Sequence, residues 1–498
     1  MRRAALTIVG VMAVVGCGRI GYDPAIDAGA GAGELRYPTD DVAAVVNATV
    51  IDLRPVASPP GATFTIAPAL PLGVVLDADS GAILGVPTAA ADAMFTVTAR
   101  AAAGVTAEFE LRLTALPGWI VDVPGDQPDD DGGADTTCLA SAAGGCTLRA
   151  AFQTANQRTL RQLILVPAGA YAIGASLGVV TNDVVIAGAG ATATIVRAAT
   201  FRPGFRAYGV TSAHTLALRG TTYRDFGNAD GAVVHATAGR VEIDDCHFAA
   251  NASAGSGGVL FASDGAVVVA RDSLFIDNES FGGCCSGWGG VIDGEGPGTT
   301  IDVDGCTATG NTSAWGSFAH VTSGTNLRLI NSTLARNVAT IAGALASPGG
   351  HYLVVNSTIV ANTNTRDDAA GLYVHASPAR YQLVNTIVAG NTDASGAEHD
   401  CRKNDPATVV TSLGGNLIGD AAGNCAASFD QPSDRLSTDP LLEPGAPSDH
   451  GGPTPTLLLQ AGSPAHAAGV SAQCPPRDQR GRPRPPGAAC DLGATETP

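Results

Sequence analysis

Lysine is almost missing from this chain of 498 residues, in which Lys403 is the only one. Its 28 basic residues stand against 46 acidic ones, which gives a net charge of −18. Binding to nucleic acid depends on lysine and arginine side chains that neutralise phosphates. The charge balance therefore argues against nucleic acid as a partner.

Long apolar runs are also missing, since the run over 4–15 has only twelve residues and a bilayer takes about 20. It follows Arg2 and Arg3, as in a secretory signal. The next residues, Val14-Val15-Gly16-Cys17, resemble the bacterial lipobox. That resemblance implies cleavage of residues 1–16 and a diacylglyceryl anchor on Cys17, and Gly18 implies sorting to the outer membrane or cell surface. The alternative is an ordinary signal with a chance cysteine.

The spacings of metal sites, C-x-x-C and H-x-H, do not occur, so we expect no metal bound by cysteine or histidine. When Cys17 is set aside, ten of the 11 cysteines remain. An even number of cysteines favours disulfides in an exported protein. The acidic stretch 125–135 offers oxygen ligands for Ca²⁺ at Asp129, Asp131 and Asp135. It lacks the EF-hand spacing, and we favour a solvated linker over 117–137. No other cofactor is expected.

The first two segments of the mature chain are short. Residues 17–33 are small and polar, which predicts a flexible tether. Over 34–116, β-branched runs separated by turns such as "DADSG" (77–81) predict a small β-sandwich. The stretch 70–88 resembles the motif of immunoglobulin-like domains of bacterial surface proteins, which serve as spacers or binding modules; we favour a spacer. The matching residues are Leu70, Pro71, Gly73, Leu76, Asp77, Gly81, Ile83, Gly85, Pro87 and Thr88.

A repeat dominates the region 138–438, as in "INSTLARN" and "VNSTIVAN". Each copy ends on asparagine, and successive copies lie 23 to 33 residues apart. The segments alternate with a period of two, so each copy predicts one coil of a right-handed parallel β-helix. The fold class is therefore all-β. The asparagines are Asn228, Asn251, Asn278, Asn311, Asn337, Asn362 and Asn391.

The repeat also predicts which side chains point inward. Three residues before each asparagine comes an apolar ladder that includes Phe248 and Phe275, and five before comes a ladder of small residues. The asparagines should form tight left-handed bends, with amides bonded from coil to coil. Cys246 and Cys306 are two coils apart, ~9–10 Å, which is too far for a disulfide. Cys284 and Cys285 lie in an excursion, and their partners stay open.

The two ends of the β-helix carry further signals. Over 146–157, "CTLRAAFQTANQ" places Leu148, Ala151, Phe152 and Ala155 on one face of a predicted capping helix. It resembles the segment that opens the β-helix of many bacterial exported proteins, and Cys138 is expected to pair with Cys146 at its entrance.

Residues 439–498 resemble the closing segment of choice-of-anchor Q proteins, whose β-helix is pectin-lyase-like. The resemblance implies a C-terminal cap, closed by Cys474 and Cys490, after a loop closed by Cys401 and Cys425. His450 and Ala467 depart from the pattern. The matching residues are Asp439, Pro440, Leu442, Gly451, Gly452, Thr454, Thr456, Gly462, Ser463, Pro464, Ala465, Gly469, Asp478, Gln479, Arg480, Gly481, Arg484, Asp491, Gly493, Ala494 and Glu496.

Catalytic residues of polysaccharide-degrading β-helices are hard to find here. The polygalacturonase pattern is reduced to "NTD" at 391–393. Uronate lyases use a basic residue with acidic Ca²⁺ ligands on neighbouring coils, and Arg271, Asp272, Asp302 and Asp304 are candidates of that kind. The alternative is that they form solvated ion pairs, such as Arg271 with Asp244 or Asp304.

Two functions therefore remain. We favour a non-catalytic, lipid-anchored surface protein whose rigid β-helix makes structural or adhesive contacts with carbohydrate or other cell-surface components. The alternative is a carbohydrate-active enzyme, a polysaccharide lyase or glycoside hydrolase, with a divergent site on the β-helix. Fold alone does not decide between them. A cleft with clustered Asp and Arg across three or more coils would favour the enzyme. A flat shaft covered by Ser, Thr and Asn would favour the surface protein.

Overall fold

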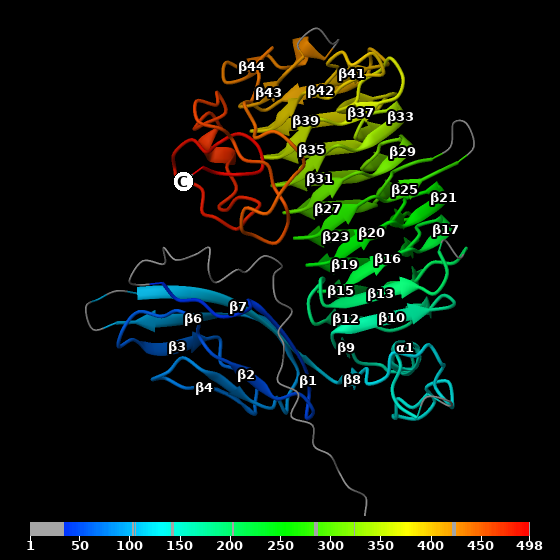
Figure 1. Cartoon of the computed structure of the whole chain (residues 1–498), viewed down its shortest axis with the longest axis vertical. Coiled ribbons are helices and arrows are strands. Elements are labelled where there is room, and N and C mark those ends of the chain that lie inside the picture. The colour runs from blue at the N-terminus through cyan, green and yellow to red at the C-terminus, as the bar shows by residue number, and fades with distance from the viewer. Residues whose placement is uncertain are drawn as a thin grey trace, which may run out of the picture.

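Two β-rich units make up the protein: an N-terminal sandwich and a long parallel β-helix (Figure 1). The computed structural model describes residues 34–497 apart from 102–103, 105, 141–143, 202–203, 283–286, 323 and 421–424. The predicted lipid site Cys17, the tether 17–33, and the pair Cys284 and Cys285 lie outside the described residues.

The sandwich has one sheet of four strands and one of three. Phe95, Val97 and Ala99 alternate with more exposed residues and enter its core, which is the pattern of a sheet with one buried face. The β-sandwich expected for this region is thus confirmed. Its strands are β1 (Asp41–Val45), β7 (Thr106–Leu116), β6 (Ala91–Arg100) and β3 (Thr63–Ala67) in the first sheet, and β2 (Ile51–Leu53), β5 (Ile83–Gly85) and β4 (Val74–Leu76) in the second.

The segment after the sandwich is ordered, which corrects the expected solvated linker over 117–137. Only Pro117 separates β7 from β8 (Gly118–Ile120), and β8 pairs in parallel with the first full strand of the β-helix. The acidic side chains that follow bind groups at the start of the β-helix. Asp122 accepts the backbone N–H of Cys146 at 2.6 Å, and Asp126 pairs with Arg149 at 2.9 Å. The sandwich and the β-helix are therefore joined by continuous, packed chain.

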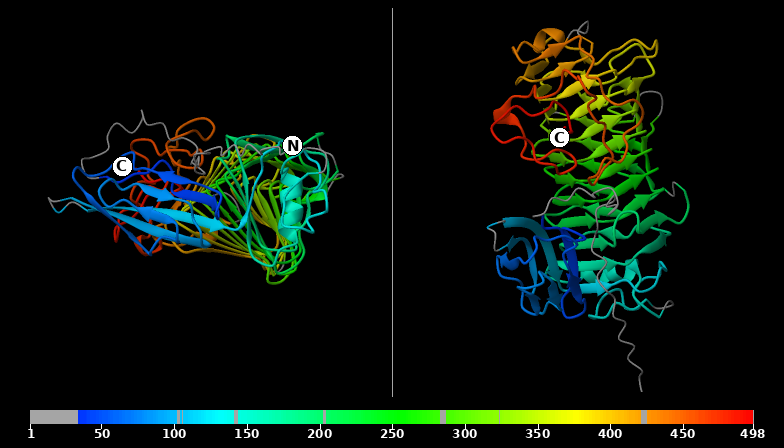
Figure 2. Two further views of the ribbon diagram at one scale, coloured as in Figure 1. Left: turned by 90° about the horizontal axis from the view of Figure 1, so that it is seen from below. Right: turned by 60° about the vertical axis from the view of Figure 1, so that its left-hand side comes forward.

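Each full coil of the β-helix runs through four parallel sheets, which we name A to D in chain order. Figure 2 shows the coils end-on and from the side. Sheet A holds β8, β9 (Gln162–Val166), β12 (Val184–Gly188), β15 (Thr215–Arg219), β19 (Arg240–Asp244), β23 (Val267–Arg271), β27 (Thr300–Asp304), β31 (Asn326–Ile330), β35 (His351–Val355), β39 (Arg380–Val384) and β42 (Val409–Ser412). Sheet B holds β10 (Gly169–Ile173), β13 (Thr194–Ala198), β16 (Thr222–Arg224), β20 (His247–Ala249), β24 (Leu274–Ile276), β28 (Thr307–Thr309), β32 (Thr333–Ala335), β36 (Thr358–Val360), β40 (Ile387–Ala389), β43 (Leu417–Ile418) and β44 (Arg435–Leu436).

Sheets C and D complete each coil. Sheet C holds β17 (Gly227–Asp230), β21 (Ala252–Ser256), β25 (Glu279–Ser280), β29 (Thr312–Trp315), β33 (Val338–Ala342) and β37 (Thr363–Asn364). Sheet D holds β11 (Gly178–Val179), β14 (Tyr208–Val210), β18 (Val234–Ala236), β22 (Leu260–Ala262), β26 (Ile292–Gly294), β30 (Ala319–Val321), β34 (Leu345–Ser347), β38 (Leu372–Val374) and β41 (Cys401–Lys403).

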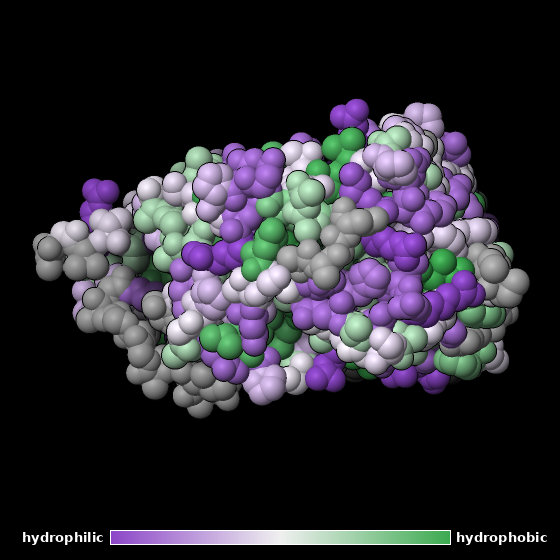
Figure 3. Space-filling model, turned by 90° about the horizontal axis from the view of Figure 1, so that it is seen from above, coloured by the Kyte–Doolittle hydropathy of each residue, from purple (hydrophilic) through white to green (hydrophobic). Residues whose placement is uncertain are grey.

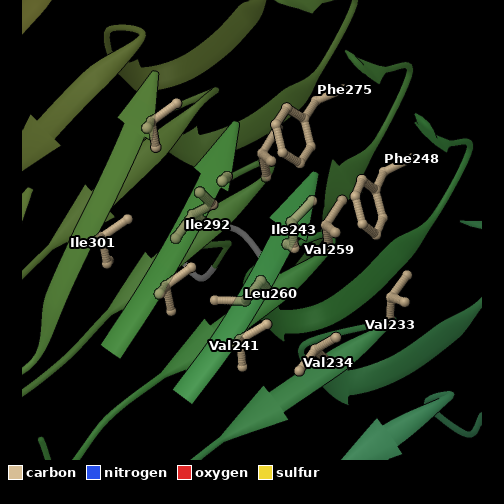
Figure 4. Close-up of a cluster of buried hydrophobic side chains, with 14 of the residues drawn as sticks. Val233, Val234, Val241, Ile243, Phe248, Val259, Leu260, Phe275, Ile292 and Ile301 are labelled. Carbon is tan, nitrogen blue, oxygen red and sulfur yellow. The ribbon is translucent and has the colours of Figure 1, made fainter. Parts of the chain in front are cut away.

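The interior of the β-helix is built from stacked apolar side chains, as the repeat predicts. Phe248 stacks on Phe275 of the next coil with ring centroids 5.3 Å apart (Figure 4). The apolar ladder continues in register through Ala308, Leu334, Ile359 and Val388, and all six side chains are buried. The ladder of small residues is buried as well: Cys246, Ser273, Cys306, Ser332, Ser357 and Thr386. Both inward ladders are thus confirmed.

The asparagine ladder forms hydrogen bonds from coil to coil, but two details of its prediction are wrong. The residue in the left-handed bend is the one before the asparagine, as at Arg336 (φ 60°) before Asn337. The first copy was misplaced as well, since the position below Asn251 belongs to Phe226, whose N–H bonds to Asn251 Oδ1 at 3.1 Å. Asn228 lies within β17 instead, because this copy has Phe226 at the position that asparagine holds in the later copies, three residues after Tyr223.

The predicted capping helix is α1 (Leu148–Asn156). The side chain of Thr147 caps it by accepting the N–H of Ala150, and α1 covers the first coil with the predicted face, since Leu148, Ala151, Phe152 and Ala155 are buried (Figure 2). A disulfide joins Cys138 to Cys146 in front of it. At nine residues, α1 is too short to cross a membrane, and no other helix in the described ranges meets that requirement.

The C-terminal segment lies along the side of the β-helix, which corrects its description as an end cap (Figure 1). The outer face of sheet B carries apolar residues such as Val360 and Ile387, and the segment covers them with Leu457, Leu459 and Leu492. The end itself is formed by residues 401–438, which include the short 3₁₀ helix η1 (Ala426–Ser428). Its surface is largely hydrophilic (Figure 3).

Two further disulfides fasten this region, between Cys401 and Cys425 and between Cys474 and Cys490. The second pair lies beside the 3₁₀ helix η2 (Ser471–Gln473). The segment is also held by polar contacts: the Gln479 side-chain amide donates to the carbonyl of Cys306 at 3.1 Å, and Arg484 forms a buried ion pair with Glu496 at 2.8 Å. The "DQRG" stretch thus anchors the segment to the β-helix.

Candidate functional site

The catalytic candidates predicted from the sequence lie on the outer side of sheet A. Four neighbouring strands end in alternating charges that pair in register: Arg219, Asp244, Arg271 and Asp304. Arg271 thus stands between Asp244 and Asp304, as the ion-pair interpretation predicts. Opposite charges on adjacent strands stabilise a sheet modestly. Asp302 is separate from these groups and forms an exposed pair with Arg328 at 3.3 Å.

Arg271 and Asp272 line a cleft of about 540 Å³ between the sandwich, sheet A and the C-terminal segment. Asp304 pairs in register with Arg271 but, like Asp302, is not among the lining residues of the cleft. No motif in the sequence indicates that the sandwich completes this site. The lining residues are Asp40, Asp41, Asp92, Ala93, Met94, Arg112, Gly220, Asp244, Asp245, Arg271, Asp272 and Pro453.

Arginines bridge the sandwich and the β-helix around this cleft. Arg112 of β7 reaches Asp92 at 3.6 Å and Asp244 at 3.3 Å. Arg161 reaches the same Asp92 at 2.6 Å and Glu242 at 3.5 Å. Burial raises the pKa of Asp244 although three arginines oppose the shift. Burial likewise raises the pKa of Asp41 to about 6.

A second candidate surface is the outer face of sheet D. The central residue of each strand in this sheet points away from the core, because its neighbours on the strand point inward. These central residues pair in register and form a column: His235, Phe261, Asp293, His320, Ala346, Tyr373 and Arg402. This column is not among the sites expected from the sequence. Its signal is the residue three positions after a pair of small residues, as Asp293 in "GGVIDG" and His320 in "GSFAHV".

At the centre of the column, His320 and Asp293 form a buried pair. Their atoms Nδ1 and Oδ1 are 2.7 Å apart, and the two residues are 4% and 0% exposed. The other carboxylate oxygen of Asp293 is buried with no hydrogen-bond partner in the described part of the chain. Glu295 lies nearby, and its pKa is raised by burial first and then by the charge of Asp293. Three titratable groups therefore meet on one face of the sheet.

Aromatic rings flank this pair. The ring of Trp288 lies 6.4 Å from that of His320. Trp315 lies 4.9 Å from His375 and 5.9 Å from Tyr373, and it packs on a small apolar patch with Ala346. Partly exposed aromatic rings beside a few polar groups are typical of binding sites for small ligands and sugars.

The predicted calcium residues have another role in the structure. Asp129, Asp130 and Asp131 bring carboxylate oxygens within 4.8 Å of one another. However, Asp129 accepts the Thr154 hydroxyl at 3.1 Å, and Asp131 accepts several backbone N–H groups that lower its pKa. Asp135 lies apart and accepts the N–H of Thr137. These carboxylates order the turn that precedes α1.

The cysteines within the described ranges follow the predicted pairing. Cys138–Cys146, Cys401–Cys425 and Cys474–Cys490 are bonded, whereas Cys246 and Cys306 are free and buried. The two free thiols occupy the small-residue ladder two coils apart, which is the geometry that excludes a bond between them.

Of the comparisons with known proteins, one bears on the N-terminal unit. Residues 36–115 match the family described as "Putative Ig domain". Among solved structures, the chain is similar to a family 28 exopolygalacturonase of Yersinia enterocolitica, with 12% identity, a TM-score of 0.22, and coverage of 74% of this chain and 89% of that one. No curated protein matches the chain by sequence. The described chain is thus an immunoglobulin-like sandwich joined to a parallel β-helix.

Proposed function

We propose that this protein is an exported surface protein that binds a polysaccharide along the outer face of sheet D. The observation that carries the proposal is the pair of partly exposed rings Trp288 and Trp315, which lie on neighbouring coils beside the outer face of sheet D, Trp288 near His320 and Trp315 near Tyr373 and His375. The partly exposed rings offer apolar faces to sugar rings. The Asp293–His320 pair is buried and joins two neighbouring coils, so it supports this surface from within.

Export and anchoring belong to the same proposal. Three disulfides are expected in an oxidising compartment, and the lipobox-like residues before Cys17 favour a lipid anchor in the outer membrane or at the cell surface. The sandwich then acts as a spacer near the membrane. Replacing Cys17 with serine tests the anchor, since the protein should move from the membrane fraction to the soluble fraction.

A second function, polysaccharide cleavage, is favoured by the same pair. A histidine held by a carboxylate is a typical general base, and a carboxyl group with a raised pKa is a typical general acid. In such an enzyme, Glu295, which is partly exposed, would give a proton to the leaving oxygen, and His320, which is 4% exposed, could take one from the sugar or from water only if the side chains above it moved aside. The Glu295 carboxyl and the His320 imidazole, which would carry out this exchange, lie on one face and belong to neighbouring coils.

The test is retention of the purified full chain on immobilised acidic and neutral polysaccharides, with and without Ca²⁺. Retention on one polymer that falls at least tenfold in Trp315→Ala supports the proposed binding face. Trp119→Ala is the matched control, because Trp119 is also partly exposed but lies beside α1. New reducing ends or unsaturated uronates that disappear in His320→Ala would establish the enzyme instead. Retention that is equal in both tryptophan variants would contradict the binding face.

A further inference from the structure

The outer face of sheet D holds a cleft of about 420 Å³ at its first three strands, β11, β14 and β18. The proposed function does not use this cleft. One arginine and no acidic residue are among its lining residues, although the whole chain carries a net charge of −18. The charge of the cleft therefore favours an anion as its ligand.

A missing side chain forms the floor of the cleft. Gly209 is the central residue of β14 and pairs in register with Val179 of β11 and with His235 of β18. A Cβ at Gly209 would first meet Cγ2 of Val179, at 3.3 Å. Because glycine leaves this space open, Val179 and His235 form walls on either side of it.

The segment before β14 supplies a third wall. Phe205 forms a bridge with Gly227 of β17, and its ring lies 6.3 Å from that of Phe226, edge to face. Phe205 is partly exposed and lines the cleft. These contacts hold the segment against the β-helix and fix the position of the next residue, Arg206.

Arg206 is the charged member of the lining. The pKa of His235 is lowered first by burial and then by the charge of Arg206, so the guanidinium lies near the imidazole, and the imidazole is neutral at pH 7. Asp230 attracts Arg206 only from a distance, since no ion pair joins Arg206 to an acidic residue in the described part of the chain. The carboxylate of Asp230 instead accepts the N–H of Ser256 at 3.2 Å. A half-buried guanidinium in this position favours a ligand that brings a negative charge.

The chemistry of the lining narrows the choice of anion. The planar fork of a guanidinium matches a carboxylate, and a single arginine balances a single negative charge. Val179 and Phe205 offer apolar surface to the body of the ligand, while Thr211 and Asn228 add a hydroxyl and an amide group to the lining. Apolar walls with a few polar groups are typical of sites for small molecules. A small ring that carries one carboxylate has this combination of groups.

We propose that this cleft binds a cyclic monocarboxylate, with its carboxylate on Arg206 and its ring against Phe205 and Val179. Two sources share this chemistry: a uronic acid, free or at the end of a polysaccharide, and an aromatic acid. The site is separate from the proposed polysaccharide surface, because Trp288 belongs to the coil of β26, two strands further along sheet D than His235. It therefore does not rest on the proposed function.

The experiment is calorimetric titration of the purified full chain at pH 7.5 with sodium glucuronate and with sodium benzoate. Glucose and benzamide are their uncharged counterparts. We expect a carboxylate to bind at one site per chain and its uncharged counterpart to bind about tenfold more weakly, and the tighter of the two carboxylates identifies the source. Arg206→Gln should weaken the carboxylate by a similar factor. Arg197→Gln removes an exposed arginine of sheet B outside the cleft and should bind as the wild type.

The proposal would be overturned if neither carboxylate bound, or if an uncharged counterpart bound as tightly as its carboxylate. Equal losses in Arg206→Gln and Arg197→Gln would contradict it as well, because only the overall charge would then matter. Gly209→Val gives an independent check, since its side chain fills the floor and should abolish binding while Arg206 stays in place. Trp315→Ala should leave the binding of the carboxylate unchanged, which separates this site from the polysaccharide surface. A loss in that variant would place the ligand on the tryptophan rings and contradict the cleft.

Discussion

Asn311 donates a hydrogen bond of 2.8 Å from Nδ2 to Oδ1 of Asn337, although 26 residues separate the two. The same bond recurs between every neighbouring pair from Asn251 to Asn391, and each Oδ1 also accepts the backbone N–H of the preceding asparagine. All of these side chains are buried. The ladder thus provides hydrogen-bond acceptors for the backbone N–H groups at the bend where the strands of sheet B end.

Removing one rung should destabilise the whole β-helix. In Asn337→Ala, the amide groups of Asn311 and the carbonyl of Ala308 lose their partners in a buried site. We expect the free energy of unfolding to fall by about 3 kcal/mol and the melting temperature, followed by circular dichroism, to fall with it. Asn326→Ala is the control, because Asn326 is exposed at the start of β31 and should change stability by less than about 0.5 kcal/mol. Equal losses in both variants would contradict the role of the ladder.

The fold could be predicted from the sequence because the repeat encodes it locally. The side chains at fixed distances before each asparagine, such as Phe248 and Cys246, reveal both the period and the inward face. The bend was misplaced by one residue because asparagine itself favours left-handed geometry, whereas Arg336 and Ala361 adopt it here. The first copy is predicted two residues too late because Phe226 holds the ladder position there and the nearest asparagine, Asn228, already belongs to β17.

The candidate sites could not be predicted in the same way. Asp293 and His320 are 27 residues apart, and no local motif joins them; only the exact alignment of the coils brings them together. The cleft depends on how the sandwich packs against sheet A, and no repeat encodes that contact. The repeat predicts Arg271 and its neighbour Asp272 because Arg271 shares a register position with Asp244 and Asp304, while Asp41 and Arg112 belong to another domain.

Asp400 ends the asparagine ladder and should make stability depend on pH. It accepts Asn391 Nδ2 at 2.7 Å, and burial raises its pKa to about 8 from an ordinary 3.8. The folded protein therefore keeps a proton that the unfolded chain releases, so this contribution is fully present below pH 4 and is lost as the pH rises through 8. The largest effect is on the order of 5 kcal/mol.

The variant Asp400→Asn removes this titration. The melting temperature of the wild type, relative to that of the variant, should be lower at pH 9 than at pH 5. Asp302→Asn, which removes an exposed carboxylate, should follow the wild type at both pH values. A difference between wild type and Asp400→Asn that stays constant from pH 5 to pH 9 would disprove the assignment.

Cys246 and Cys306 should be inert in the folded protein. Both are fully buried, and burial raises the pKa of each thiol well above its usual value, so the reactive thiolate is scarce. We expect iodoacetamide at pH 8 to leave both unmodified until the protein is unfolded, as read by peptide mass spectrometry. The cystines at Cys401–Cys425 and Cys474–Cys490 serve as internal controls that react only after reduction. A peptide that links Cys246 to Cys306 would refute the register of the coils.

The sandwich and the β-helix should unfold together, because an apolar contact joins them. Val45, Ala43 and Leu116 of the sandwich pack on Leu163 and Val185 of sheet A. In Val45→Asp, a charge enters this contact, which should cost about 3 kcal/mol. The single calorimetric transition of the wild type should then separate into two, with the sandwich melting first.

Val75→Asp is the matched control for this change, because it introduces the same charge on the same sandwich at a side chain that is 62% exposed. It should leave one transition at nearly the wild-type temperature. Two transitions already present in the wild type would mean that the contact does not couple the units.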